Sequence, residues 1–334
     1  MPKRLLPLLG LLLAGLLPAT APGQVLDSTL WVTDGPVRAI ARSGNTIYLG
    51  GDFTRVLPNT GGGGVVDPVS GQLVHNPRIN GTVRASAPDG NGGWFIGGPF
   101  THVQGSDRSG LAHLRADGSL DKAWNPQLNG QVYGLLAVGN VVYAWGWFTS
   151  VDGKPRNNLA ALDAATGQVT AWNPDADGEV MALAVSGGTV YAGGTFTTIG
   201  GQSRAYLAAL DAATGRATAW NPAPPRHVHA IAVAGNTIYL GSIPDLPGTQ
   251  PGNSLTAVDA TTGLATGWSL KADGDVITLA VSGGTVYAGG TFYFVDDKVR
   301  PGAVAIDAAT GQVTAWDPGL KVSKSGISAI VVDG

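Results

Sequence analysis

The stretch YAGGTF at residues 191–196 decides the fold, because it returns along the whole chain. The same string occupies residues 287–292, and related strings begin at Tyr48, Phe95, Tyr143 and Tyr239. Successive copies therefore lie 47 or 48 residues apart. A second marker keeps the 48-residue spacing at Trp124, Trp172, Trp220, Trp268 and Trp316. Two markers with one period indicate a repeat architecture.

Each repeat carries four short apolar runs separated by turn residues. In the copy that contains YAGGTF these runs are VMALAV (180–185), TVYAGG (189–194), YLAALD (206–211) and RATAW (216–220). Runs of five or six residues between Gly-rich turns are typical of β-strands, and Gly or Pro recurs too often for a helix of ordinary length. We therefore expect four strands per repeat and almost no helix outside the N-terminal leader.

Four-stranded repeats of this length are typical of propeller blades, in which sheets pack face to face around an axis. The predicted fold class is all-β, a β-propeller of six complete four-stranded blades of about 48 residues plus a partial seventh blade from the two chain ends. A β-solenoid is the main alternative, although solenoid coils are usually shorter.

The two ends of the chain resemble pieces of a blade. Residues 30–32 resemble a fourth strand, and GISAIVVDG at residues 326–334 resembles a first strand followed by the start of its turn. A propeller ring is commonly closed by a blade shared between the chain ends. Two interpretations stay open: a seven-bladed design truncated after Gly334, and a six-bladed ring with both ends as additional strands.

The motifs YAGG, LDAATG and AWNP together resemble those of the delta-60 repeat propellers of secreted bacterial proteins. The match covers residues 25–334, and a looser similarity extends to the kelch repeat, in which a glycine pair ends the second strand. The resemblance implies a propeller fold. It implies little about function, because kelch propellers are mostly binding modules and one fold serves many functions.

The start of the chain has the pattern of a secretory signal peptide. Lys3 and Arg4 precede an apolar run over residues 5–17 and then small residues, so we expect cleavage after Gly23. The predicted domains are therefore a signal peptide at residues 1–23 and a propeller at residues 24–334, in a secreted or periplasmic protein with cell-surface association left open. An uncleaved membrane anchor is the alternative, although the run is shorter than the roughly 20 residues that span a bilayer.

Composition limits the classes of partner. The formal net charge is −3, and removing Lys3 and Arg4 with the leader makes it −5, so the chain lacks the basic footprint of a nucleic-acid-binding protein. There are no cysteines, which excludes disulfides and thiolate chemistry. We expect no nucleic-acid partner, no membrane insertion after signal removal and no cofactor. The expected partner is an extracellular protein or glycan of unknown identity.

Residues that return in every repeat are interpreted as scaffold. The tryptophans are expected to pack between neighbouring blades, where each indole N–H needs an acceptor. A ring of arginines, Arg108, Arg156, Arg204 and Arg300, is expected to bind loop carbonyls or stack on aromatic rings, with anion binding as the alternative. The aspartates that open the DAATG turns are expected to bind backbone amides two residues on.

Residues that depart from the repeat are the candidates for function. Trp145 and Trp147 replace a Gly and a Thr, and two indoles on one strand face can stack a sugar ring. Arg226, His227 and His229 stand at the start of the fifth repeat, where the histidines could serve a metal if a third ligand were present. Carboxylates at residues 175–179 and 273–275 suggest calcium, but their equivalents in other repeats lack them.

These patterns favour a binding or structural-interaction module. No sequence motif identifies a nucleophile, a base or paired catalytic carboxylates, and we assign no catalytic or metal residue. The alternative is an exported propeller enzyme, a hydrolase or lyase, with its site at one channel mouth. Such a site can assemble from separate blades without leaving a local motif.

Overall fold

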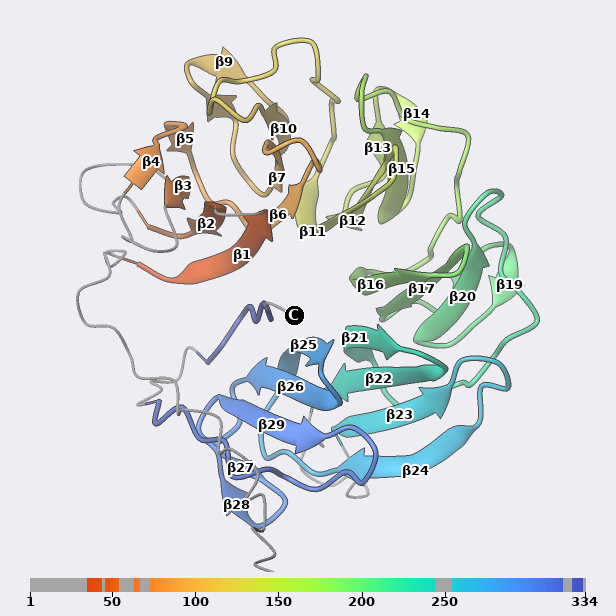
Figure 1. The fold of residues 1–334 in the computed structure, drawn as a ribbon. Helices are drawn as coiled ribbons and strands as arrows, with labels where there is room; N and C mark the ends of the chain where they lie inside the picture. The colour runs from red at the N-terminus through yellow and green to blue at the C-terminus, as the bar shows by residue number, and fades with distance from the viewer. Residues whose placement is uncertain are drawn as a thin grey trace, which may run out of the picture.

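In the computed structural model, β-sheets succeed one another around a central axis in the order of the sequence (Figure 1). The structure describes residues 35–43, 46–53, 63–66, 73–243, 254–320 and 326–332. Within these ranges there is no helix. The fold is an all-β propeller, as the repeat predicts, and the described sheets form six blades.

The strands of each blade follow one another outward from the axis. Blade 1 consists of β1 (Val37–Ser43), β2 (Thr46–Gly51), β3 (Gly63–Val66) and β4 (Leu73–His75). Blade 2 has β6 (Ala85–Pro88), β7 (Trp94–Gly97) and β10 (Leu111–Leu114), and blade 3 has β11 (Gln131–Val138), β12 (Val141–Trp147) and β15 (Leu159–Asp163). Blade 4 has β16 (Val180–Ser186), β17 (Thr189–Gly194) and β20 (Leu207–Asp211). Blade 5 has β21 (Val228–Ala234), β22 (Thr237–Ser242), β23 (Leu255–Asp259) and β24 (Ala265–Leu270), and blade 6 has β25 (Val276–Ser282), β26 (Thr285–Gly290) and β29 (Ala303–Asp307).

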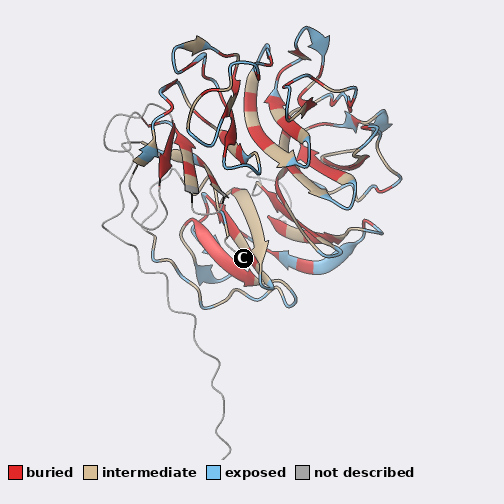
Figure 2. Cartoon of the chain, turned by 45° about the horizontal axis from the view of Figure 1, so that its top comes forward, coloured by how far each residue is buried: buried red, intermediate tan, exposed pale blue. Residues whose placement is uncertain are grey.

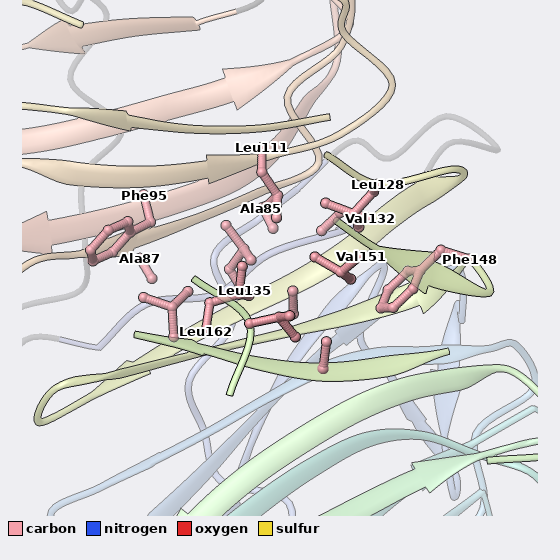
Figure 3. Close-up of a cluster of buried hydrophobic side chains, with 14 of the residues drawn as sticks. Ala85, Ala87, Phe95, Leu111, Leu128, Val132, Leu135, Phe148, Val151 and Leu162 are labelled. Carbon is pink, nitrogen blue, oxygen red and sulfur yellow. The ribbon is translucent and has the colours of Figure 1, made fainter. Parts of the chain in front are cut away.

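The cores lie between blades. Figure 3 shows one of them, in which Phe95 and Ala85 of blade 2 face Val132, Leu135 and Leu162 of blade 3. Burying one large apolar side chain is worth about 1.5–3 kcal/mol, so face-to-face contact of blades is the main stabilising element of the ring. Strands such as β17 are buried along almost their whole length, and Figure 2 shows exposed residues mainly at the turns and loops. This explains why strands read as continuous apolar runs.

The periodic tryptophans join neighbouring blades, as expected. Trp172 packs edge-on against Tyr143 of its own blade, with ring centroids 5.2 Å apart, and its Nε1 donates a hydrogen bond to the carbonyl of Asp211 in the next blade. Trp220 and Trp268 donate in the same way to Asp259 and Asp307. Each bond satisfies a buried indole N–H and fixes the position of one blade against the next.

The periodic arginines bind carbonyls, which confirms their interpretation as scaffold. The guanidinium of Arg156 donates to the carbonyls of Pro155 and Thr170, and that of Arg204 donates to those of Ser203 and Thr218. Arg108 and Arg300 repeat the pattern. Each arginine therefore ties the loop after the second strand to the fourth strand of its own blade.

Two features differ from the expected four-strand pattern. In blades 2, 3, 4 and 6 the fourth strand is reduced to one bridge, such as Leu162 with Val169. In the same blades the loop after the second strand forms a small hairpin. These hairpins are β8 (His102–Val103) with β9 (Ser106–Asp107), β13 (Ser150–Val151) with β14 (Lys154–Pro155), β18 (Thr198–Ile199) with β19 (Gln202–Ser203), and β27 (Phe294–Val295) with β28 (Lys298–Val299). In blade 2, β5 (Ile79–Asn80) extends the hairpin to three strands.

Residues 326–332 lie against blade 6, in the space between β25 and β1 in Figure 1. The N–H of Ile327 donates to the carbonyl of Gly290, and the side chains of Ile327 and Ile330 approach Gly289. Val228 and Ile231, from the innermost strand of blade 5, approach Gly193 of blade 4 in the same way. Residues 326–332 therefore lie against blade 6 where the innermost strand of a following blade would lie. The predicted strand at residues 30–32 and the predicted signal peptide at residues 1–23 lie outside the described residues.

Candidate functional site

One end of the propeller carries both the hairpins and the segments that lead from blade to blade. In an antiparallel blade, the connection between the second and third strands and the exit from the fourth strand leave at the same end. Hydrogen bonds confirm this proximity: the N–H of Asp177, between blades 3 and 4, donates to the carbonyl of Thr198 in a hairpin. We call this end the hairpin face and the opposite end the turn face.

A β-bulge marks the hairpin-face end of most innermost strands. The register of the first two strands shifts between Val37 and Ala39 in blade 1 and between Val132 and Gly134 in blade 3. Blades 4, 5 and 6 repeat this shift at the equivalent place. Because a bulge turns a side chain away from the regular pleat, the residue inside it is released from packing between blades.

The bulge residues, the residues two positions earlier and their counterparts in blade 2 form a set that we call the axial rim. Its members are Pro36, Arg38, Thr82, Arg84, Gln131, Tyr133, Glu179, Met181, His227, His229, Asp275 and Ile277. Tyrosine, tryptophan and aspartate recur at the scaffold positions of these blades, whereas the rim positions differ in charge, size and polarity. The blade scaffold therefore does not dictate the rim residues.

Polar contacts link the rim residues of blades 1, 2 and 3. Asp52 accepts hydrogen bonds from Arg38 of its own blade and from Thr82 of blade 2. The bond from Arg38 is the main reason why the pKa of Asp52 lies below its usual value. Arg84 donates from Nη1 to Oε1 of Gln131 at 3.0 Å, and its guanidinium lies 5.3 Å from the ring centre of Tyr133. A cation and an aromatic ring thus stand together on this side of the rim.

Charge effects and one aromatic contact extend to blades 4, 5 and 6. Burial, together with the negative charge of Glu179, raises the pKa of Tyr133. The ring of His227 packs edge-on against Tyr206 of blade 4, with centroids 4.7 Å apart. Burial lowers the pKa of His229, and the nearby carboxylate of Asp275 opposes that shift. The lowered pKa favours the neutral form of His229 at pH 7. Glu179 and Asp275 place carboxylates on this side of the rim.

Tyr206 has an unusual backbone. Its φ is +68°, a region that bulky residues rarely adopt, whereas the equivalent places in blades 2 and 6 hold Gly110 and Gly302 with φ of +74°. The exchange of glycine for tyrosine brings an aromatic ring to His227 at the cost of backbone strain. Such strain is typically found at functional positions.

The sequence candidates fall into two groups. His227 and His229 belong to the axial rim, while Arg226 directly precedes them. Trp147 is 61% exposed and pairs with the rim residue Gln131 across β11 and β12. These candidates, from blades 3 and 5, therefore share the hairpin face. Their role as ligand-binding residues stays a prediction.

Trp145 has a different environment from Trp147, so the two indoles are not an equivalent exposed pair. The Trp145 ring packs between blades and donates from Nε1 to the carbonyl of the rim residue Met181 at 3.0 Å. The ring lies over Gly134, where a Cβ atom would come within 2.0 Å of it. Blade 4 has Ala182 and Gly193 at these two places, so blade 3 has exchanged both residues together.

A groove of about 640 Å³ opens on the hairpin face between blades 2 and 3. Phe100 and Leu128 form part of its apolar lining, and Gln131 links it to the axial rim. His102 and Asp107 stand at its edge, with Nε2 and Oδ1 2.9 Å apart. Apolar walls with a few polar groups at the edge are typical of ligand sites.

The carboxylates considered for calcium have other partners. Asp177 accepts the N–H groups of Thr197 and Thr198, and Asp273 accepts those of Tyr293 and Phe294. Both therefore hold the hairpin of their own blade. Across the described ranges, no group of three or more His, Asp or Glu residues is suited to holding a metal ion.

A second group of charged side chains lies towards the turn face of blade 2. His113 stands between Asp89 and Asp121, 3.0 Å and 3.3 Å from their Oδ2 atoms, and its ring stacks on Phe95. Blade 1 has Val65 at this place, and blades 3 to 6 have alanine, as at Ala161 and Ala209. The three side chains are largely buried and satisfy one another, so the cluster replaces the small residue of the other blades as part of the structure and is not an open site.

Sequence reasoning missed Arg84 and Tyr133, which belong to no motif. It considered Glu179 only as a calcium ligand and Tyr206 only as part of a repeated strand, because the contacts of these residues join different blades. Their position in the repeat could have identified the rim residues. A valine stands at or near the start of the innermost strand of each blade, and the positions on either side of it hold residues of different types from blade to blade.

Comparison with known proteins agrees with this architecture. The family model described as outer membrane protein assembly factor BamB matches residues 23–263, and a second, overlapping match covers residues 183–319. No curated protein matches the chain. In the part of the chain that the structure describes, no helix is long and apolar enough to cross a membrane.

Solved structures show the same fold at low sequence identity. The WD40 propeller domain of Doa1 is 12% identical with a TM-score of 0.59, over 86% of this chain and 83% of that one. The computationally designed protein Ika8 is 18% identical with a TM-score of 0.52, over 88% and 90% of the two chains. The Pan2 WD40 domain of Neurospora crassa is 13% identical with a TM-score of 0.52, over 79% and 73%. At such identities the likeness concerns the fold alone.

Proposed function

The chain belongs to the family described as outer membrane protein assembly factor BamB, and from this premise we propose that it is an exported propeller that binds polypeptide partners on its hairpin face. Its biochemical role is then to hold a partner, not to transform it. The general role, a propeller module for interaction or structural support, follows from fold and family together.

One observation carries the choice of face. The turn face repeats the same Asp-Ala-Ala-Thr-Gly chemistry from blade to blade, as at Asp163, Asp211 and Asp307. The axial rim instead combines residues that differ in charge, size and polarity, and Arg84 of blade 2 contacts Gln131 and Tyr133 of blade 3. A ring that only supported itself would need no such variety, whereas recognition of an asymmetric partner requires it.

We favour a polypeptide over a glycan as ligand. The family description concerns the assembly of proteins, and only Trp147 of the predicted tryptophan pair is exposed enough to stack a sugar. The rim residues Arg84, Tyr133, His227 and Glu179 provide charge, aromatic area and hydrogen bonds, a mixture that suits protein interfaces.

Export to the periplasm or beyond is part of the proposal. The leader-like residues 1–23 support it, and the family match begins at residue 23, beside the expected cleavage site. The narrower resemblance to delta-60 and kelch propellers rests on the YAGG, LDAATG and AWNP motifs and is proposed on that ground.

Photo-crosslinking in cells tests the proposal. A photoreactive amino acid replaces Trp147, beside the axial rim, or Leu264, which is 69% exposed in a turn of the opposite face. We expect a discrete polypeptide adduct from position 147 and none from position 264. Adducts from position 264 alone, or no adduct from position 147, would refute binding at the hairpin face.

A further inference from the structure

The hairpin of blade 6 differs from the other described hairpins in its exposed side chains. Tyr293, Phe294 and Val299 are 51%, 42% and 46% exposed. Phe294 and Val299 are direct cross-strand partners, and the rings of Tyr293 and Phe294 are 5.2 Å apart. The three side chains therefore form one apolar surface, which we call the blade-6 patch.

The scaffold does not require this patch. The hairpin of blade 4 has Thr197, Thr198 and Ser203 at the same three places, and that of blade 3 has Thr149, Ser150 and Pro155. These hairpins have the same two-pair geometry with small or polar residues. Apolar side chains exposed together at a surface are typical of interaction sites.

The carboxylate beneath the patch also differs. In blade 4 the hydroxyl of Thr197 donates to Oδ2 of Asp177 at 2.6 Å, in addition to the N–H bonds to Oδ1. In blade 6 Tyr293 replaces that threonine, and only Oδ1 of Asp273 accepts hydrogen bonds from the described residues. Oδ2 of Asp273 therefore remains an acceptor at the place where the Thr197 hydroxyl reaches Asp177 in blade 4, next to Tyr293.

The negative charge at this place is not needed for the hairpin itself. In blade 3 the amide oxygen of Asn129 accepts the N–H groups of Thr149 and Ser150, as Asp273 does for Tyr293 and Phe294. Further carboxylates stand next to the patch. Asp296 and Asp297 form the hairpin turn, and the one lysine of the hairpin, Lys298, lies 3.6 Å from Asp297.

We propose that the blade-6 patch docks an extended segment of a partner polypeptide through an arginine flanked by apolar side chains. The guanidinium lies over the rings of Tyr293 and Phe294 and donates to Oδ2 of Asp273, while an apolar neighbour covers Val299. Arginine fits both demands, because its planar group stacks on aromatic faces and matches a carboxylate. The inference rests on the proposed function and names the chemistry of the segment that the hairpin face holds.

Binding of two short blocked peptides tests this proposal by fluorescence anisotropy. In one peptide arginine alternates with leucine, and in the other glutamate replaces every arginine. We expect the arginine peptide to bind and the glutamate peptide to bind at least tenfold more weakly. Added salt is expected to weaken binding of the arginine peptide, because part of the attraction is electrostatic.

Three variants locate the binding surface. Asp273→Asn keeps the hydrogen bonds to the hairpin, as Asn129 does in blade 3. We expect it to weaken binding of the arginine peptide about tenfold. The double variant Tyr293→Thr with Phe294→Thr adopts the residues of blade 4 and weakens it at least as much. Asp177→Asn makes the same charge change in blade 4, where no aromatic patch exists, and leaves binding unchanged. Urea unfolding midpoints of the three variants verify that each remains folded.

The proposal is wrong if the arginine peptide does not bind, if the glutamate peptide binds equally well, or if Asp177→Asn weakens binding as much as Asp273→Asn. Its failure is separable from failure of the proposed function. Suppose that a partner crosslinks at position 147 and that the blade-6 variants bind the arginine peptide as the wild type does. This result would refute the role of the blade-6 patch and still support binding at the hairpin face.

Discussion

At the scale of single residues, one aromatic pair performs the same task in successive blades. The tryptophan packs on the tyrosine of its own blade and donates its indole N–H to the next blade, as Trp172 does to Asp211. Trp124 is the exception: its Nε1 is buried and has no hydrogen-bond partner among the described residues. Its ring is tilted by 44° against Phe95, whereas the rings of Trp172 and Tyr143 stand at 72°.

This contrast provides a matched pair of substitutions. Trp172→Phe removes the bond between blades and leaves the carbonyl of Asp211 without that donor, whereas Trp124→Phe removes an N–H that has no acceptor. Both lose similar apolar area. We expect the free energy of unfolding to fall by about 1 kcal/mol more for Trp172→Phe, which urea titration measures. Equal losses would mean that the indole bond contributes nothing.

The turn aspartates make stability depend on pH. The pKa of Asp163, Asp211 and Asp307 lies below its usual value, because the hydroxyl and then the N–H of the threonine three residues on donate to the carboxylate. A carboxyl group whose pKa is lower in the folded state stabilises the fold while it is ionised. This contribution is complete above its pKa in the unfolded chain, about 3.9, and is lost as the pH falls through its pKa in the folded protein.

We therefore expect the urea midpoint to fall as the pH is lowered from about 5 towards 2. Replacing Asp163, Asp211 and Asp307 with asparagine, which keeps an acceptor but does not titrate, reduces this dependence. A pH profile that is identical in the wild type and the triple variant would contradict the account.

At the scale of the element, blade 3 shows how a blade tolerates a large departure from the repeat. Trp145 occupies the place of Gly193, and its ring fits only because Gly134 replaces the alanine found at Ala182. Together the two exchanges bring an indole to the carbonyl of the rim residue Met181. The pair is thus one structural unit.

A double-mutant cycle measures this coupling. Gly134→Ala alone places a Cβ within 2.0 Å of the Trp145 ring and is expected to lower the free energy of unfolding by about 1–3 kcal/mol. Trp145→Gly alone leaves a void. The double variant adopts the residues of blade 4 and is expected to recover much of the loss, so the effects are strongly non-additive. Additive effects would show that the two residues act independently.

Strand content was predictable from the sequence only where the period is strong. The runs that became β16, β17 and β20 are apolar, short and bounded by glycine turns, and the sequence assigns them correctly. The hairpin β18–β19 does not stand out in the sequence, because two-residue strands carry no alternation that can be recognised. Its stability comes instead from a hydrogen bond to Asp177 of the preceding segment.

At the scale of the whole molecule, the ring separates support from recognition. Residues that recur every 48 positions bind blade to blade. Residues of the axial rim vary, and some of them contact other blades, as Arg84 does with Gln131 and His227 with Tyr206. The sequence could predict the first group from its period. It could identify His227, His229 and Trp147 as departures, but the contacts of Arg84 with Tyr133 and of Tyr206 with His227 join separate blades and exist only in three dimensions.

The last described segment is expected to support blade 6. Ile327 and Ile330 approach Gly289 in the way that Val228 and Ile231 approach Gly193. Changing both isoleucines to serine is expected to lower the free energy of unfolding by about 2 kcal/mol, through lost burial. Val331→Ser, at a side chain that is 46% exposed, serves as the control and has little effect. Equal effects of the two changes would place the isoleucines outside the core.

Hydrogen exchange with and without the crosslinked polypeptide partner tests the central claim most directly, because it reports on both faces of the ring at once. The account predicts slower exchange in the hairpins β13–β14, β18–β19 and β27–β28 and in the bulged starts of β11, β16, β21 and β25, with the turns at Asp163, Asp211 and Asp307 unchanged. Protection of those turns, with the hairpins and bulges unaffected, would contradict it and move recognition to the opposite face.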